Sequence, residues 1–150
     1  MKMKPNTVLI KKLNNNSFEL PKYQTEGSVG MDLSAFLDND ILIKPNERDL
    51  IPTGIALSLP QNIEAQVRPR SGLSLKYGIT VLNSPGTIDS DYRGEIKVIL
   101  INHGSEDFII KNNDRIAQLV FNEVVKVSFK EVNNLDQTSR DQKGFGSTGK

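Results

Sequence analysis

Alternation of apolar and polar residues with period two is the feature that most constrains the fold of this chain. It occurs at 63–67, 96–100 and 125–129, where every second side chain is apolar. Successive side chains of a β-strand point to opposite faces, so this pattern is typical of strands that are buried on one side. Helical periodicity is scarce, and the alternation therefore predicts a chain built mainly of strands.

Further short apolar runs are separated by residues that favour turns. The runs lie at 41–43, 50–59, 79–82, 108–110 and 116–121, with turn signals such as Lys44-Pro45-Asn46, Ser84-Pro85-Gly86 and Asn112-Asn113-Asp114. Many short strands at this spacing favour an all-β fold, either a β-sandwich, a jelly roll or a barrel.

One segment reads as a short helix. Residues 71–77 contain helix formers, begin with Ser71 as a candidate N-cap and are followed by Gly78, which can end a helix. The glycine-rich tail, in contrast, contains one aromatic residue, Phe145, and too few apolar residues to order itself. We therefore expect a β-rich domain at 1–132 and a mobile C-terminal arm at 133–150.

Composition excludes several classes of protein. The 150 residues suit one domain, and the absence of cysteine removes disulfides and thiolate metal sites. A formal net charge of +1 gives no global attraction for nucleic acid or an anionic membrane. The apolar run at residues 8–10 is too short for a signal peptide, so a cytoplasmic or otherwise intracellular protein is expected.

Residues 68–72, Arg-Pro-Arg-Ser-Gly, lead from a predicted strand into the predicted helix. Arg70 supplies charge, Ser71 a hydroxyl and Gly72 an unobstructed N–H, which together suit a phosphate group. An ordinary helix cap with solvated arginines is the alternative interpretation of the same residues.

Residues 82–94 read as a β-hairpin with a polar turn. Its backbone groups and the amide of Asn83 suit the edge of a flat base, while Asp89 adds a carboxylate and Tyr92 an aromatic ring. A simple polar hairpin is the alternative.

Three further segments complete the candidates. Residues 144–150 match the spacing of a P-loop, but no strand precedes them and no helix follows, so a P-loop is rejected. Residues 30–33 place Asp32 between small and apolar residues, and residues 114–119 set Arg115 and Gln118 within a strand-like run. His103 lies in a polar turn and reads as solvated.

Taken in order, five segments resemble the five motifs of the trimeric dUTPase family along nearly the whole chain. They are Gly-Met-Asp-Leu at 30–33, Arg-Pro-Arg-Ser-Gly-Leu at 68–73, Gly-Thr-Ile-Asp-Ser-Asp-Tyr-Arg-Gly at 86–94, Asp-Arg-Ile-Ala-Gln-Leu at 114–119, and Arg140 with Gly-Phe-Gly-Ser-Thr-Gly at 144–149. The resemblance implies a jelly-roll-like fold and a homotrimer with active sites shared among three chains. It also implies hydrolysis of dUTP to dUMP and pyrophosphate, which supplies dUMP for thymidylate synthesis and keeps uracil out of DNA.

The same resemblance implies a role for each site residue. Asp89 would orient and deprotonate the attacking water and contact the sugar. Phosphates would be held by Arg70, Ser71, Gly72 and Gln118, and by Arg140, Ser147 and Thr148 when the arm closes. The nucleoside would contact Asn83, Thr87, Ile88, Tyr92, Lys97, Phe145 and Gly146.

Magnesium is the expected cofactor, since a triphosphate carries about four negative charges near neutral pH that a nearly neutral protein must offset locally. No carboxylate cluster in the sequence forms a cage, so no direct protein ligand is expected, and Asp32 would at most contact water on the ion.

Two alternatives remain in the sequence. A relative with the same fold, dCTP deaminase, uses a catalytic glutamate on the strand after the third motif, where this chain has Ile99. An apolar side chain cannot carry a proton, which disfavours deamination. A non-catalytic jelly-roll module that binds nucleotide or a partner protein is the second alternative.

Overall fold

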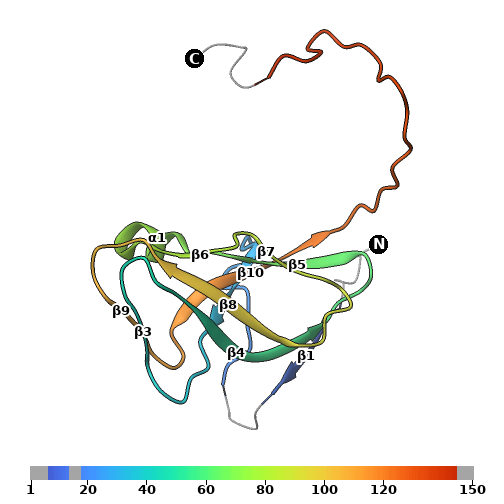
Figure 1. Ribbon diagram of the computed structural model, residues 1–150. Coiled ribbons are helices and arrows are strands. Elements are labelled where there is room, and N and C mark those ends of the chain that lie inside the picture. Colours follow the sequence, from blue (N-terminus) through green and yellow to red (C-terminus); the bar gives the residue numbers. More distant parts are fainter. Residues whose placement is uncertain (1–6, 14–17, 145–150) are drawn as a thin grey trace.

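The computed structural model of the protein describes residues 7–13 and 18–144. Within them, ten strands form three antiparallel sheets, and there is one short helix (Figure 1). The strands are β1 (Leu9–Lys12), β2 (Gly30–Ser34), β3 (Ile41–Ile43), β4 (Arg48–Ser58), β5 (Ile63–Arg68), β6 (Ile79–Val81), β7 (Gly86–Ile88), β8 (Glu95–Asn102), β9 (Phe108–Ile110) and β10 (Arg115–Glu123). The all-β fold predicted from the strand patterns is confirmed, and so is the jelly-roll-like form implied by the family resemblance.

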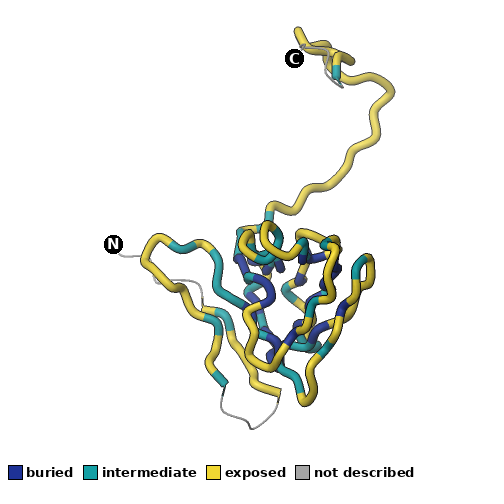
Figure 2. The backbone as a smooth tube through the Cα atoms, turned by 90° about the vertical axis from the view of Figure 1, so that its left-hand side faces the viewer, coloured by how far each residue is buried: buried dark blue, intermediate teal, exposed yellow. Residues whose placement is uncertain are grey.

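Two four-stranded sheets enclose the core. Their strand orders are β1-β4-β8-β6 and β2-β10-β5-β7, while β3 and β9 form a small separate pair. Buried residues of both large sheets form one core cluster, and the residues in loops and at the outside are mostly exposed (Figure 2). Strand β5 shows why the sequence pattern worked, because its residues alternate between buried and half-buried along its whole length.

Strand β4 pairs with β8 in two registers, separated by an irregular stretch. The register shifts between Pro52 and Ala56, and Gly54 sits in the shifted stretch with φ of 70°. A side chain at Gly54 would come within 2.9 Å of the Phe36 ring, so glycine is required there both by its conformation and by the space.

The predicted helix is confirmed as α1 (Ser71–Tyr77), and Gly78 ends it in the left-handed conformation with φ of 69°. The expected cap at its start is wrong. Arg70 occupies the N-cap position and makes no side-chain capping bond, so Ser71 is the first helical residue. At seven residues, this helix of the described chain is far too short to cross a membrane.

The strand predicted at 125–129 is not formed. Val125, Val127 and Phe129 are 85, 73 and 98% exposed in an extended segment that leaves the body after β10 (Figure 1). Alternation produces a strand only where a neighbour supplies backbone hydrogen bonds, and this segment lies away from the two sheets. Strand β10 ends at Glu123, and the domain boundary expected at residue 132 stays a prediction.

Candidate active site

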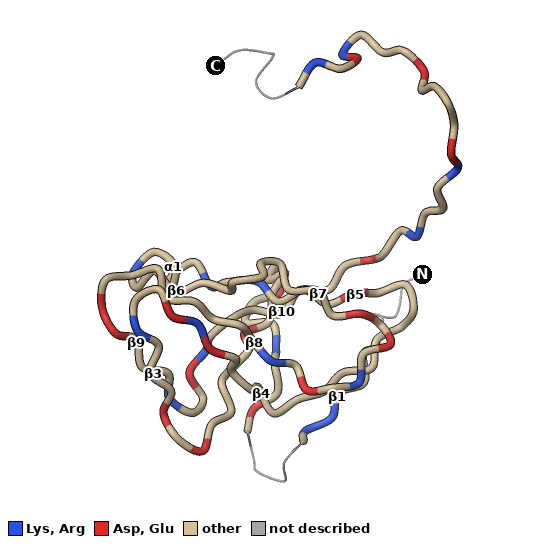
Figure 3. The backbone as a smooth tube through the Cα atoms, in the orientation of Figure 1, with Lys and Arg blue, Asp and Glu red and all other residues tan. Residues whose placement is uncertain are grey.

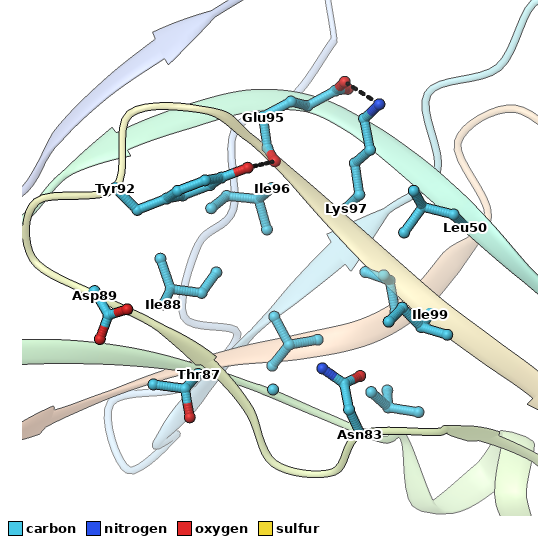
Figure 4. Close-up of a pocket in the computed structure, with 14 residues that line it drawn as sticks. Leu50, Asn83, Thr87, Ile88, Asp89, Tyr92, Glu95, Ile96, Lys97 and Ile99 are labelled. Carbon is cyan, nitrogen blue, oxygen red and sulfur yellow. Dashed lines mark hydrogen bonds and ion pairs between the residues drawn. The ribbon is translucent and has the colours of Figure 1, made fainter.

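A cavity of about 290 Å³ lies between β7 of one large sheet and β8 of the other. Polar residues line it from two sides, with Asn83, Thr87 and Asp89 on one side and Lys97, whose ammonium points toward Glu95, on the other (Figure 4). Six of the residues expected to contact the nucleoside line it together, namely Asn83, Thr87, Ile88, Asp89, Tyr92 and Lys97. The structure thus brings this part of the predicted site into one place.

The segment at 82–94 is not the hairpin expected from the sequence. The segment contains one strand, β7, which pairs with β5, whereas β6 just before the segment pairs with β8 in the other sheet. The turn at Ser84-Pro85 therefore carries the chain from one sheet to the other, which local turn signals cannot distinguish from a hairpin. This crossing is what places the cavity between the sheets.

The rim of the cavity is held by Tyr92 and Glu95. The Tyr92 hydroxyl donates to the Glu95 carbonyl at 3.1 Å, and a side chain at Gly94 would approach that hydroxyl to 2.3 Å. The Glu95 carboxylate accepts from the Gly54 N–H at 2.9 Å and lies 3.6 Å from the Lys97 ammonium (Figure 4). Glu95 therefore links β8 to the backbone of β4 beside Lys97, a role that the sequence did not reveal.

The deeper walls are apolar. Val67, Val81, Ile96, Val98 and Ile99 line the cavity, and the Asn83 amide faces them (Figure 4). Gly86 keeps this space open, because a side chain there would meet Val67 and the Asn83 nitrogen at 3.3 and 3.4 Å. Apolar walls with one amide suit a flat ring that has polar groups on its edge.

A second group of predicted residues gathers around Arg70. Its Nε donates to Asp32 Oδ1 at 3.1 Å and its Nη1 donates to the Arg115 carbonyl at 2.9 Å. The Gln118 amide donates to the Pro69 carbonyl at 3.0 Å, so Gln118 lies beside the same turn. Ser71 and Gly72 are exposed in the first turn of α1, and a side chain added at Gly72 would meet nothing within 4 Å.

The two groups occupy different surfaces of one chain. Asp89 lines the cavity beside β7 and β8, whereas Arg70 lines a depression of about 380 Å³ with Tyr77, Phe108 and Arg115. Basic and acidic positions are interspersed along the backbone in Figure 3, in agreement with the small net charge. An anion would therefore be recognised by local groups such as Arg70 rather than by an extended basic face.

Comparison with known proteins identifies the family. The family model described as dUTPase matches residues 16–149. The chain belongs to the dUTPase family. It is 61% identical to the deoxyuridine 5'-triphosphate nucleotidohydrolase of Rickettsia canadensis over 93% of this chain and 95% of that protein. The enzyme of the same name from Ehrlichia canis is 59% identical, over 98% of this chain and 99% of that protein.

Solved structures of dUTPases share the fold. A mutant dUTPase of Staphylococcus bacteriophage 80alpha with dUpNHpp has a TM-score of 0.83 at 24% identity, over 96% of this chain and 99% of that one. A mutant dUTPase of phage phi11 of S. aureus has a TM-score of 0.76 at 21% identity, over 88% and 100% of the chains. That structure is described as revealing the coordination of a structural Mg(II) ion.

The described part of the C-terminal arm, residues 133–144, lies apart from both groups in this dUTPase-family chain (Figure 1). Arg140 is exposed in the extended segment, where its Nε donates to the Lys143 carbonyl at 3.1 Å. Phe145, Gly146, Ser147 and Thr148 lie outside the described residues, so the roles expected for them stay predictions.

Asp32 is the carboxylate expected to contact water on a metal ion. Each of its oxygens already accepts from an arginine, Arg70 at Oδ1 and Arg115 at Oδ2, both at 3.1 Å. The described residues contain no group of three or more histidine or carboxylate side chains placed to hold a metal. His103 is exposed, as expected from its polar turn.

Proposed function

We propose that this chain is a dUTP pyrophosphatase, which hydrolyses dUTP at the α-phosphorus to dUMP and pyrophosphate. The observation that carries the proposal is the position of Asp89, an exposed carboxylate on the rim of the cavity that Asn83 and Tyr92 also line. Such a reaction supplies dUMP for thymidylate synthesis and keeps uracil out of DNA. An intracellular location stays a prediction.

The cavity favours uracil over the other pyrimidines. The Asn83 amide would offer a donor and an acceptor to the base edge, and the walls would leave no room for a methyl group at C5. Cytosine presents a donor where uracil presents an acceptor, and a hydrogen-bonding site rejects such a mismatch by up to about 10⁴-fold or more. Tyr92, held by the Glu95 carbonyl, would pack against the sugar and exclude a 2′-hydroxyl.

Asp89 is proposed as the general base. Its carboxylate would accept a proton from a water molecule as that water attacks the α-phosphorus, while the bond to the bridging oxygen breaks and pyrophosphate leaves. No covalent enzyme intermediate is needed. Arg70, Ser71, Gly72 and Gln118 would hold the α- and β-phosphates, and Arg140, Ser147 and Thr148 the γ-phosphate.

Magnesium is the proposed cofactor. The groups around Arg70 are mainly donors of hydrogen bonds, and the Asp32 carboxylate among them is already shared by two arginines. This donor set fits an ion bound by the phosphates and water, with no direct protein ligand. When bound, Mg²⁺ would neutralise part of the phosphate charge, and Asp32 would at most contact its water.

A homotrimer is proposed for the assembly. In one chain, Asp89 and Arg70 line different surfaces, while a single dUTP must contact both groups. A site shared between chains resolves this separation, because the Asp89 cavity of one chain can then face the Arg70 group of another. The arm of a third chain would close the site and exclude water.

Deamination of dCTP is the competing reaction. The position of its expected glutamate is Ile99, a half-buried residue of the apolar cavity wall. Glu95 is the nearest carboxylate on β8, but it already binds the Gly54 N–H and Lys97. Neither residue offers a free proton carrier, which favours hydrolysis at phosphorus. A non-catalytic nucleotide-binding module would bind dUTP without turnover.

The test is to incubate the purified protein with each dNTP and Mg²⁺ and to measure pyrophosphate and ammonia. We expect pyrophosphate from dUTP and no ammonia from dCTP. Asp89→Asn is expected to lower turnover by about 10²-fold or more, the range for loss of a general base, while nucleotide binding is largely kept.

Asp91→Asn is the matched control, since it removes an exposed carboxylate two residues away. It should leave turnover close to that of the unaltered protein. Unchanged pyrophosphate release by Asp89→Asn would remove Asp89 from its role, and binding of dUTP without any turnover by the unaltered protein would favour the non-catalytic module.

A further inference from the structure

Arg115 lies in the fourth of the family-like segments, and the proposed reaction assigns it no contact with the substrate. Its Nη1 donates to Asp32 Oδ2 at 3.1 Å, and its backbone carbonyl accepts from Arg70 Nη1 at 2.9 Å. Asp32 Oδ1 in turn accepts from Arg70 Nε at 3.1 Å. The two arginines are thus joined twice, once through the Asp32 carboxylate and once through the Arg115 carbonyl.

A β-bulge in β10 brings Arg115 into this cluster. Arg115 pairs with Ser34 and Ala117 with Leu33, so two residue steps on β10 match one step on β2. Ser34 lies on the same face of β2 as Asp32, since the two are two residues apart. Without the bulge, Ile116 would stand opposite Ser34; with it, Ile116 is buried in the core and Arg115 lies on the Asp32 face.

The cluster determines which donors of Arg70 remain available. A guanidinium has five N–H donors, and the two bonds from Nε and Nη1 leave the Nη2 donors and one Nη1 donor for a ligand. The Arg70 side chain is 27% exposed and Asp32 is 20% exposed, whereas Arg115 is 56% exposed on the outer side. Arg70 is therefore the more buried arginine of the cluster, and the more exposed Arg115 restrains it through Asp32 and through its own backbone carbonyl.

We propose that Arg115 is a positioning residue, which acts through the Asp32 carboxylate to fix the guanidinium of Arg70 toward the phosphates of the substrate. This inference rests on the proposed function. An arginine held in one orientation loses less freedom when it binds a phosphate, and small misplacements of such a group weaken binding strongly. Arg115 itself needs no contact with the substrate.

A double-mutant cycle tests the inference with Arg70→Met, Arg115→Met and the two combined. The affinity for the non-hydrolysable imido analogue of dUTP and for deoxyuridine would be measured by calorimetric titration. We expect Arg115→Met to weaken binding of the analogue by about tenfold or more and to leave deoxyuridine affinity within about twofold. In the Arg70→Met background, Arg115→Met should cause no further loss of affinity for the analogue, since Arg115 acts through Arg70.

Two more variants sharpen the cycle. Arg48→Met removes an exposed positive charge from β4, outside the cluster, and should leave the analogue's affinity unchanged. Arg115→Lys keeps the charge and one donor for Asp32, so its affinity should fall between those of the unaltered protein and Arg115→Met. Thermal unfolding reports whether each variant is folded. If Arg115→Met does not fold, Arg115→Lys takes its place in the double-mutant cycle.

Additive losses in the cycle would overturn the inference, because Arg115 would then act on the ligand independently of Arg70. An equal loss of deoxyuridine affinity would overturn it too, since a general structural defect would explain both. Pyrophosphate release by the unaltered protein distinguishes these failures from that of the proposed function. If that protein neither bound the analogue nor hydrolysed dUTP, function and inference would fail together.

Discussion

At the scale of single residues, Asn102 shows how much one buried polar side chain contributes to this fold. It is fully buried at the end of β8, where its amide nitrogen donates to the carbonyls of Ile43 at 2.9 Å and Glu106 at 2.8 Å. Its amide oxygen accepts from the Gly104 N–H at 2.8 Å. One side chain thus joins β3, β8 and the loop before β9, and it satisfies backbone groups that water does not reach.

We expect Asn102→Ala to lower the free energy of unfolding by about 2–4 kcal/mol, because the donor and acceptors left behind are buried and unpaired. Urea unfolding at one fixed protein concentration would measure the loss. Asn39→Ala, at an exposed bend, is the control and should change stability by less than about 0.5 kcal/mol. Equal stability of the two variants would show that the buried bonds of Asn102 contribute little.

At the scale of elements, the two glycines near the ends of α1 have different surroundings. Gly78 closes the helix in the left-handed conformation, and its N–H donates to the Ser74 carbonyl at 3.1 Å. A side chain at Gly78 would come within 2.5 Å of the Gly104 nitrogen. Gly72, at the other end of the same helix, has open space around it. The same substitution therefore has opposite consequences at the two glycines.

Gly78→Ala is expected to destabilise the protein by about 1–3 kcal/mol, from the left-handed backbone and the clash together. Gly72→Ala should leave stability unchanged or raise it by up to about 1 kcal/mol, since alanine favours a helix. The Gly72 variant should nevertheless raise the KM for dUTP, because a methyl group would crowd the N–H proposed to bind phosphate. Thermal unfolding and steady-state kinetics would separate the two effects, and a Gly72 variant with unaltered KM would argue against that contact.

At the scale of the whole molecule, the proposed site is complete only when several chains meet. Asp89 and Arg70 line different pockets, and the extended segment after Glu123 leads away from the β-sheets (Figure 1). Sedimentation should accordingly give three times the 16.7 kDa mass of one chain. A single-chain mass would contradict the shared site.

Mixing two inactive variants tests the sharing directly. Asp89→Asn lacks the base, and a chain truncated before Gly144 lacks the end of the arm, so each alone should hydrolyse dUTP very slowly. Unfolded together and refolded, they should regain activity in about a quarter of the sites, since a shared site can take Asp89 from one variant and the arm from the other. No recovery, with mixed trimers demonstrated by mass, would show that base and arm come from the same chain.

The sequence alone determined the class of fold and singled out the candidate reactive groups. Period-two alternation located β5 and β8, and short apolar runs located β4, β6 and β10. Helix formers followed by a glycine located α1, since all these signals depend only on near neighbours. The motif resemblance singled out Asp89, Arg70 and Gln118 as candidates. Alternation failed at 125–129, where the segment leaves the sheets and finds no strand to pair with.

Only the tertiary structure decided which of these residues meet. Residues 82–94 read as a hairpin, yet their one strand, β7, pairs with β5, while β6 just before the segment pairs with β8 in the other sheet, because pairing depends on partners distant in the chain. The bulge that turns Arg115 toward Asp32, and the bonds of Asp32 to Arg70, join residues separated by 83 and 38 positions. Register across a sheet is set by the packing of whole strands, and no local pattern of residues encodes it.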